Sequence, residues 1–384
     1  MKGVSGFIAK RLTEAREARG LRKTNLAELV QVSDSQISKY ESNSQTPSPA
    51  ILDRICSVLA MPIEYFFYER PENPDIESPI YYRSMSYATQ QQRKAAEIKY
   101  LWLQDIYTYL WEFIDFPAVN LPDINPPDSP EKISDQDVEE AADYLRQFWG
   151  LSDGPIENLS RLVENNGIVL SFFDLGADGL DGFSQKNRDR PHIIISTGKT
   201  SAVRIRFSLA HELGHLILHT KINPKTLNDS NKFKQMEQQA HRFASAFIFP
   251  QSSFCREITI PDLVTFRMRK PQWKLSIAAM IFRAKNLGLI DDDREKVLRR
   301  SYGAKKWSRT EPLDDQIEVD YPELLRDAIE LLINEGIKTR YEIINDLALP
   351  RQDIEKLLCL ETDFLKDNVI KLNLKTDYSM RAVK

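Results

Sequence analysis

The chain has 384 residues, of which 42% are hydrophobic and 28% charged, and its formal net charge is −4. This length allows two or three domains, and the slightly acidic balance excludes a general polycation, so any DNA binding must come from a local surface. Cys56, Cys255 and Cys359 are far apart and predict neither a disulfide framework nor a zinc knuckle. Because no apolar run has the length of a membrane span and no signal-peptide core is evident, we expect a cytoplasmic protein without membrane contact.

Residues 5–67 have the apolar spacing of five short helices. The third, Asp34–Glu41, directs only Ile37 and Tyr40 inward, so its other side chains are available to base edges, as in a recognition helix. Residues 1–40 also hold eight Lys and Arg against four acidic residues, a local net charge of +4. The pattern indicates binding to double-stranded DNA, and a helical module for dimerisation or partner docking is the alternative.

The run Leu26–Glu41, followed by Thr46-Pro47-Ser48, resembles the Xre/Cro family of helix-turn-helix repressors. The resemblance implies an operator as partner. It also implies DNA contacts by Ser35, Gln36 and Lys39 in the major groove, with Thr24 and Asn43 near phosphates. Gln31 stands where Gly is common in that family, which predicts a little strain in the turn. Lys23 stands where the family usually has Gln, which exchanges a phosphate hydrogen bond for a point charge.

A connecting region follows these five helices, which form the head of the chain. Pro71–Pro79 is a proline- and acid-rich linker, Tyr87–Phe116 predicts a long helix, and Pro117–Pro130 is a second proline-dense connector. The aromatic residues of the long helix favour a packing surface or a homodimer contact over a ligand site. We expect domains at residues 1–70 and 135–312, with the connecting region at 71–134 and a small helical appendage at 313–384.

The next segment predicts a small sheet flanked by helices. The expected elements are helices Asp135–Gly150 and Pro155–Asn166, strands Ile168–Phe173 and His192–Ser196, and turns at Asp178-Gly179 and Asp181-Gly182. His192 stands at a strand edge, and we expect it on the surface. Later helices are expected at Trp273–Gly288, Tyr321–Glu335, Thr339–Leu347 and Pro350–Leu360.

The stretch Phe207–His219 contains the pattern His-Glu-x-x-His inside an apolar run typical of a buried helix. His211 and His215 are four residues apart and therefore share one helix face, where both can bind one metal ion. Glu212 is the candidate general base for a metal-activated water.

Two further residues bear on that ion. Glu237, 22 positions after His215, opens a second helix and is the candidate third ligand, and the alternative is a solvated residue stabilised by the helix dipole. His219 lies about 12 Å along the helix from His211, so we do not expect it to bind the same ion. We expect it to interact with the helix dipole.

The segment Arg206–His215, with Glu237-x-x-Ala240-x-x-Phe243-Ala244 and Pro250, resembles the ImmA/IrrE family of metallopeptidases, roughly over residues 135–312. The resemblance implies a zincin-like domain with His211, His215 and Glu237 as ligands and Glu212 as base. It also implies a helix-turn-helix repressor as substrate. Zn²⁺ is the expected ion, and Mn²⁺ suits the same ligands. His241 stands where the family usually has Asn; it is either a group that stabilises an oxyanion or a histidine at the edge of the core.

Together these patterns predict an α+β multidomain protein, in which an all-α helix-turn-helix head precedes a mostly helical zincin-like domain with a small sheet. The expected function is DNA-binding transcriptional regulation by a chain that also carries a zinc endopeptidase. Its expected substrate is a repressor-type protein, either a separate one or its own linker. A transcription factor whose zincin-like domain is a non-proteolytic sensor or partner-binding module is the alternative, and a housekeeping peptidase with a helical head is the third.

Overall fold

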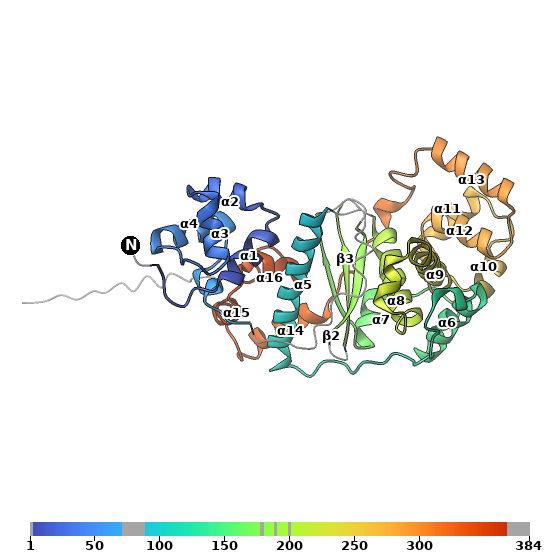
Figure 1. The fold of residues 1–384 in the computed structure, drawn as a ribbon. Coiled ribbons are helices and arrows are strands. Elements are labelled where there is room, and N and C mark those ends of the chain that lie inside the picture. Colours follow the sequence, from blue (N-terminus) through green and yellow to red (C-terminus); the bar gives the residue numbers. More distant parts are fainter. Residues whose placement is uncertain (1–2, 71–88, 177–179, 188–189, 199–200, 367–384) are drawn as a thin grey trace, which may run out of the picture.

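The computed structural model describes residues 3–70, 89–176, 180–187, 190–198 and 201–366 (Figure 1). The linker predicted at Pro71–Pro79 and the turn predicted at Asp178-Gly179 lie outside these residues. Within them, no helix is both long and apolar enough to cross a membrane.

The head consists of the five short helices that the sequence predicts. They are α1 (Ala9–Ala18), α2 (Lys23–Val30), α3 (Asp34–Glu41), α4 (Pro49–Leu59) and the 3₁₀ helix η1 (Ile63–Phe66). Ser33 begins α3 with a capping box, in which its hydroxyl accepts from the Gln36 backbone N–H and the Gln36 side chain accepts from the Ser33 N–H. Gln31 ends α2 with φ 58°, so a non-glycine residue does occupy the left-handed turn position.

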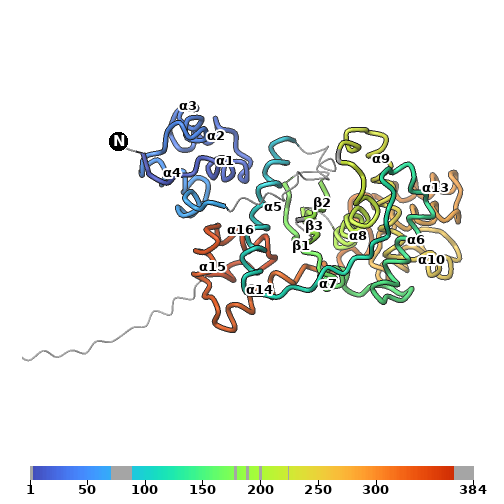
Figure 2. Tube along the Cα trace, turned by 60° about the horizontal axis from the view of Figure 1, so that its bottom comes forward, coloured from blue at the N-terminus to red at the C-terminus, as the bar shows by residue number. Residues whose placement is uncertain are grey.

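The long helix α5 spans Gln90–Trp111, shorter than the predicted range, because Thr89 caps its start and the chain becomes irregular after residue 112. Its buried side chains share one hydrophobic core with the head, one face of the sheet, and the C-terminal helices. Those helices are α14 (Leu324–Asn334), α15 (Arg340–Leu347) and α16 (Arg351–Leu357). The C-terminal helices therefore lie against α5 and the head (Figure 2).

The sheet has three strands, β1 (Val169–Phe173), β2 (Gly182–Asn187) and β3 (Arg190–Ser196), in the order β1-β3-β2. β1 runs parallel to β3 and β2 runs antiparallel to it. β1 and β3 were predicted, whereas β2 was not, because only the turn before it had a clear sequence signal. Val169, Phe183 and Ile194 face the core shared with α5, and Leu170, Ile193 and Ile195 face the opposite core.

The second core fills the other half of the molecule, where α8 (Ala202–Leu218) packs on the sheet and α9 (Ser230–Ile248) packs on α8 (Figure 1). The remaining helices of this half are α6 (Asp135–Phe148), α7 (Leu159–Asn165), α10 (Gln251–Glu257), α11 (Leu263–Trp273), α12 (Ile277–Asn286) and α13 (Asp292–Ala304). Short 3₁₀ turns are η3 (Pro130–Lys132), η4 (Pro224–Asn228) and η5 (Asp314–Gln316).

Three predicted helix limits in this half were wrong. The helix predicted at Pro155–Asn166 begins only at Leu159, where Asn158 caps it. Trp273 ends α11, because Lys274 is left-handed with φ 46° and Ser276 caps α12. α9 begins at Ser230, where Asp229 caps it, rather than at Glu237. The fold class itself is confirmed: a helical head precedes a mostly helical domain with a small sheet.

Candidate metal centre and DNA-binding face

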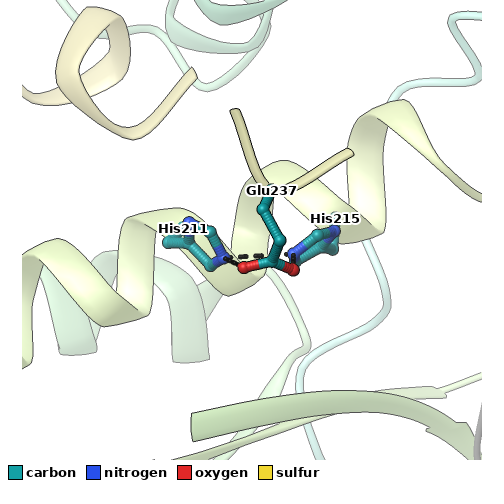
Figure 3. A group of neighbouring side chains, drawn as sticks. All are labelled: His211, His215 and Glu237. Carbon is teal, nitrogen blue, oxygen red and sulfur yellow. Dashed lines mark hydrogen bonds and ion pairs between the residues drawn. The ribbon is translucent and has the colours of Figure 1, made fainter. Parts of the chain in front are cut away.

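Three side chains from two adjacent helices converge on one point. His211 and His215 project from the same face of α8, and Glu237 of α9 places its carboxylate between the two imidazoles (Figure 3). One donor atom from each residue lies within 4.8 Å of the other two. Since Glu237 lies in the interior of α9, the alternative of a solvated residue at the helix start does not describe it.

The spacing of these donor atoms suits a tetrahedral ion. The Nε2 atoms of His211 and His215 are 3.1 Å apart, and the Glu237 oxygens lie 3.4 Å from His211 Nε2 and 3.3 Å from His215 Nε2. Zinc bonds of about 2.0–2.1 Å in a tetrahedron require donor separations of about 3.3–3.4 Å. The 3.4 Å distance involves Oε2 of Glu237 and the 3.3 Å distance involves Oε1, so each carboxylate oxygen has the separation of a tetrahedral donor from one of the two imidazoles.

Electrostatics support an anionic Glu237. Burial acts to raise its pKa, but hydrogen bonds and charge from His211 and His215 outweigh this and hold the pKa well below its usual range. A divalent cation at the same point would act in the same direction. The carboxylate is thus available as a ligand throughout the neutral pH range.

Glu212 lies beside the ligands but belongs to the sheet side of α8. It is buried, and the Ser184 hydroxyl of β2 donates to its Oε2 at 2.8 Å. Burial raises the pKa of Glu212 to about 7, against lowering by His211 and Ser184. Proton transfer near neutral pH suits a group with this pKa. Ser184 is a contact that sequence analysis missed, because nothing marks one serine in an unpredicted strand.

His219 stays outside the ligand group, as predicted, but its predicted interaction with the helix dipole was wrong. It is fully buried, and burial lowers its pKa to about 3, so the ring is neutral. Its Nδ1 lies 2.8 Å from His215 Nδ1, and its Nε2 lies 3.1 Å from Gln239 Oε1. His219 therefore contacts the candidate ligand His215 on the side of the ring that carries Nδ1, away from Nε2.

The protons along this chain can be assigned. The Gln239 amide nitrogen donates to the carbonyls of Pro130 (2.8 Å) and Ile133 (2.9 Å), which directs Oε1 toward His219. Because Oε1 can only accept, His219 Nε2 must carry the proton, and its Nδ1 must then accept from His215. His215 consequently keeps the lone pair of Nε2 for an ion. Sequence analysis missed Gln239, although it lies between Glu237 and His241.

His241 lies one turn after Glu237 at the solvent-facing side of the site. Its ring centroid is 4.5 Å from that of His211, and it stacks on Phe207 at 5.6 Å. The residue is exposed as a whole, whereas desolvation of the ring and charge from His211 lower its pKa to about 3, so the ring is neutral.

The prediction that His192 lies on the surface was wrong. His192 has 0% exposure, and its strand lies between β1 and β2 in the sheet. Its side chain faces α5, where Tyr107 and Tyr100 pack against it at 5.2 and 5.8 Å. Burial lowers its pKa to about 3, and neither ring nitrogen has a hydrogen-bond partner among the described residues.

Four of the five predicted DNA-contact residues are accessible to solvent. Thr24, Ser35, Lys39 and Asn43 are exposed, whereas Gln36 is half-buried. The Gln36 carbonyl oxygen is used in the α3 capping box, so its amide nitrogen is the group left for a base.

The positive surface is smaller than the sequence count suggested. Arg16 pairs with Glu41 at 2.5 Å, Arg11 pairs with Glu14 at 2.9 Å, and Arg19 pairs with Asp353 at 2.7 Å. Lys23, predicted as a point charge near a phosphate, lies 3.2 Å from Glu41. Lys10, Arg22 and Lys39 are exposed and are the cations most accessible to a phosphate backbone.

Known proteins match both halves of this arrangement. The helix-turn-helix family matches residues 12–66, and the peptidase family described as IrrE N-terminal-like domain matches residues 163–259. The second range contains the three candidate ligands, Glu212 and Ser184. An HTH-type transcriptional regulator of Rickettsia conorii is 33% identical over 95 residues, which are 25% of this chain and 70% of the relative.

Proposed function

This chain belongs to the family of HTH-type transcriptional regulators and carries an IrrE N-terminal-like peptidase-family domain, and on that premise we propose that it is a DNA-binding regulator that is also a zinc endopeptidase. Its proposed substrate is a repressor-type protein, cleaved in trans or within this chain. The observation that carries the proposal is the convergence of His211, His215 and Glu237 beside the buried carboxylate of Glu212. We place this activity in the cytoplasm, where operator DNA is accessible.

The proposed chemistry uses each group in turn. A bound zinc ion supplies Lewis acidity toward a peptide carbonyl and makes a water molecule easier to deprotonate. Glu212 accepts that proton as general base and then donates it to the leaving amine. Ser184 holds the Glu212 carboxylate in position through its hydrogen bond. His241 is the exposed group that can donate to the developing oxyanion.

The sheet offers a way to orient the substrate. β2 is an edge strand in the order β1-β3-β2, and it also carries Ser184, the residue that touches Glu212. An extended peptide added to this edge would run beside the general base, with main-chain hydrogen bonds that do not depend on its side chains. This arrangement favours cleavage of an extended segment over cleavage within a folded helix.

The test compares new protein N-termini in cells that produce the wild type or Glu212→Gln. A terminus present only with the wild type identifies the substrate and shows whether the bond lies in this chain or in a second protein. Glu335→Gln, an exposed change in the C-terminal region, is the matched control and should behave as the wild type. Equal termini in all three strains would overturn proteolysis and favour the non-proteolytic sensor.

DNA binding has its own test. Lys39→Ala should weaken operator binding and reduce its salt dependence by about one counterion, because Lys39 is exposed on α3. Lys296→Ala, an exposed lysine on α13 in the other half of the molecule, is the control. The same experiment, read at increasing protein concentration, reports whether the head binds as a homodimer.

A further inference from the structure

A cavity of about 510 Å³ lies where the head, α5, the sheet and the C-terminal helices meet. We propose that this cavity binds a small organic anion, a carboxylate or phosphate ester with a flat apolar part. The site is separate from the metal centre and from the DNA-binding face. A small molecule bound there would contact the head, α5, the sheet and the C-terminal helix α16.

The walls of the cavity come from distant parts of the chain. α1 contributes Ala18 and Arg19, α5 contributes Lys99 and Trp102, and α16 contributes Asp353, Lys356 and Leu357; the end of β1, the segment after it and the segment after β3 contribute Phe172, Phe173, Asp174, Gly176 and Thr197. In sheets with parallel strands, ligands commonly bind beyond the carboxyl ends of the strands. The cavity lies at that end of β1, and its volume is within the range of small-molecule sites.

The charges around the cavity are not balanced. Three cations, Arg19, Lys99 and Lys356, line it with two carboxylates, Asp174 and Asp353, a net charge of +1. Arg19 is already held by both carboxylate oxygens of Asp353 at 3.1 and 2.7 Å. Neither Lys99 nor Lys356 has a carboxylate within 4 Å among the described residues. The nearest polar contact of the Lys99 ammonium is the backbone carbonyl of Asp174 at 3.2 Å.

Lys99 is the residue that an anion would stabilise most. Burial lowers its pKa, and the neighbouring cations Arg19 and Lys356 act in the same direction, against Asp353 and Asp174. A bound carboxylate or phosphate would supply the direct ion pair that Lys99 does not have among the described residues.

The remaining wall is apolar and aromatic. Trp102 and Leu357 are buried, and the Phe173 ring lies 5.6 Å from the Lys99 ammonium. The cations thus lie beside aromatic faces, so a ligand with an anionic head and a flat apolar body fits both kinds of wall. Inorganic phosphate alone would use only the charged half.

Binding is measured by isothermal titration calorimetry on the full chain, with naphthyl phosphate, naphthoate and the neutral match naphthol as probes. We expect saturable one-to-one binding of at least one anion and binding of naphthol weaker by about tenfold or more, since one charge-assisted hydrogen bond accounts for about that factor. Lys99→Gln should weaken the anion by about tenfold, and Lys356→Gln should weaken it by less, because Lys356 is exposed.

Lys94→Gln is the matched control, because Lys94 is on the same helix, pairs with Glu97 at 2.9 Å and lies outside this cavity. It should bind as the wild type does. Any of three results overturns the proposal: no binding of either anion at millimolar concentration, naphthol binding as tightly as the anions, or an affinity lowered by Lys94→Gln but not by Lys99→Gln.

Discussion

Buried histidines on the two sides of the sheet differ in their hydrogen-bond partners. Toward α8, His215 and His219 form a hydrogen-bonded chain that ends on Gln239 and two backbone carbonyls. Toward α5, His192 lies among aromatic rings, and neither of its nitrogens has a partner among the described residues. Burial depth does not separate them, since His192 and His219 both have 0% exposure.

Burial alone therefore does not distinguish the histidines of the candidate centre, whereas an ordered proton chain distinguishes His215 from His192. A ring whose two nitrogens are both assigned presents a fixed lone pair to an ion, whereas an unpartnered ring only fills space. One atom of the candidate centre has no such partner: His211 Nδ1 is buried without a hydrogen-bond partner among the described residues. Within the candidate centre, therefore, His215 is oriented by its neighbours more firmly than His211.

Removing a candidate ligand should produce the largest effect. The effect should be limited to the centre formed by His211, His215 and Glu237, on the α8 side of the sheet. Glu237→Gln replaces the anionic ligand with a neutral amide, so zinc affinity should fall by more than about 100-fold, beyond the loss that an outer-shell change causes. Competition with a chromophoric chelator measures the affinity, and far-UV circular dichroism checks the fold. His192→Phe, on the other face, should bind zinc as the wild type does. Equal affinities for Glu237→Gln and the wild type would exclude this centre.

Breaking the proton chain should have the next largest effect. Gln239→Leu removes the acceptor of His219, so His215 loses its fixed tautomer and zinc affinity should fall by about 10–100-fold. Gln235→Leu is the control, because Gln235 also donates to the Pro130 carbonyl, at 3.1 Å, whereas the histidine chain ends on Gln239. If both variants lost affinity equally, the anchor to Pro130 and not the histidine chain would orient the site.

The sequence predicted the metal face better than the opposite face, for a physical reason. His211, Glu212 and His215 share one helical turn, so their relation depends only on helix geometry, and Glu237 follows on the next helix. The burial of His192 depends instead on tertiary packing: β2 was not predicted, and β3 lies between β1 and β2 with His192 facing α5. The contact of Ser184 was not predicted for the same reason, since Ser184 lies on β2.

The predictions of helix ends and of surface charge were wrong where tertiary contacts determine them. The head's net charge of +4 over residues 1–40 did not become an equally positive surface, because Arg11, Arg16 and Arg19 are held in ion pairs. The partner of Arg19 is Asp353, more than 300 positions away, a contact that no local pattern announces. The short helices of the head, by contrast, follow from local capping and apolar spacing and were predicted.

His192 should make the free energy of unfolding depend on pH. An unfolded histidine has a pKa of about 6.5, and burial lowers that of His192 to about 3. Below about pH 6.5 the unfolded state therefore binds a proton that the native state does not, and stability falls by about 1.4 kcal/mol per pH unit. The charge of Arg190 opposes protonation as well. His192→Phe should abolish this contribution.

Urea unfolding of the wild type and His192→Phe at about pH 7.5 and about pH 5.5 measures the difference. The variant should gain about 1.4 kcal/mol over the wild type between the two pH values, since other titrating groups are common to both proteins and cancel. If the two proteins lost stability in parallel, His192 would have to take up a proton in the folded state.

Two serines, one on each face, allow the smallest and most direct comparison. Ser184 donates to Glu212 at 2.8 Å, and Ser171 of β1 donates to the Leu357 carbonyl of α16 at 2.5 Å. Each hydrogen bond is worth about 1 kcal/mol. Ser171→Ala should lower the free energy of unfolding by that amount and leave turnover unchanged. Ser184→Ala should slow hydrolysis of the identified substrate by about fivefold, because a carboxylate free to rotate spends less time facing the scissile bond. Turnover that responds equally to both serines would mean that the two faces are not functionally distinct.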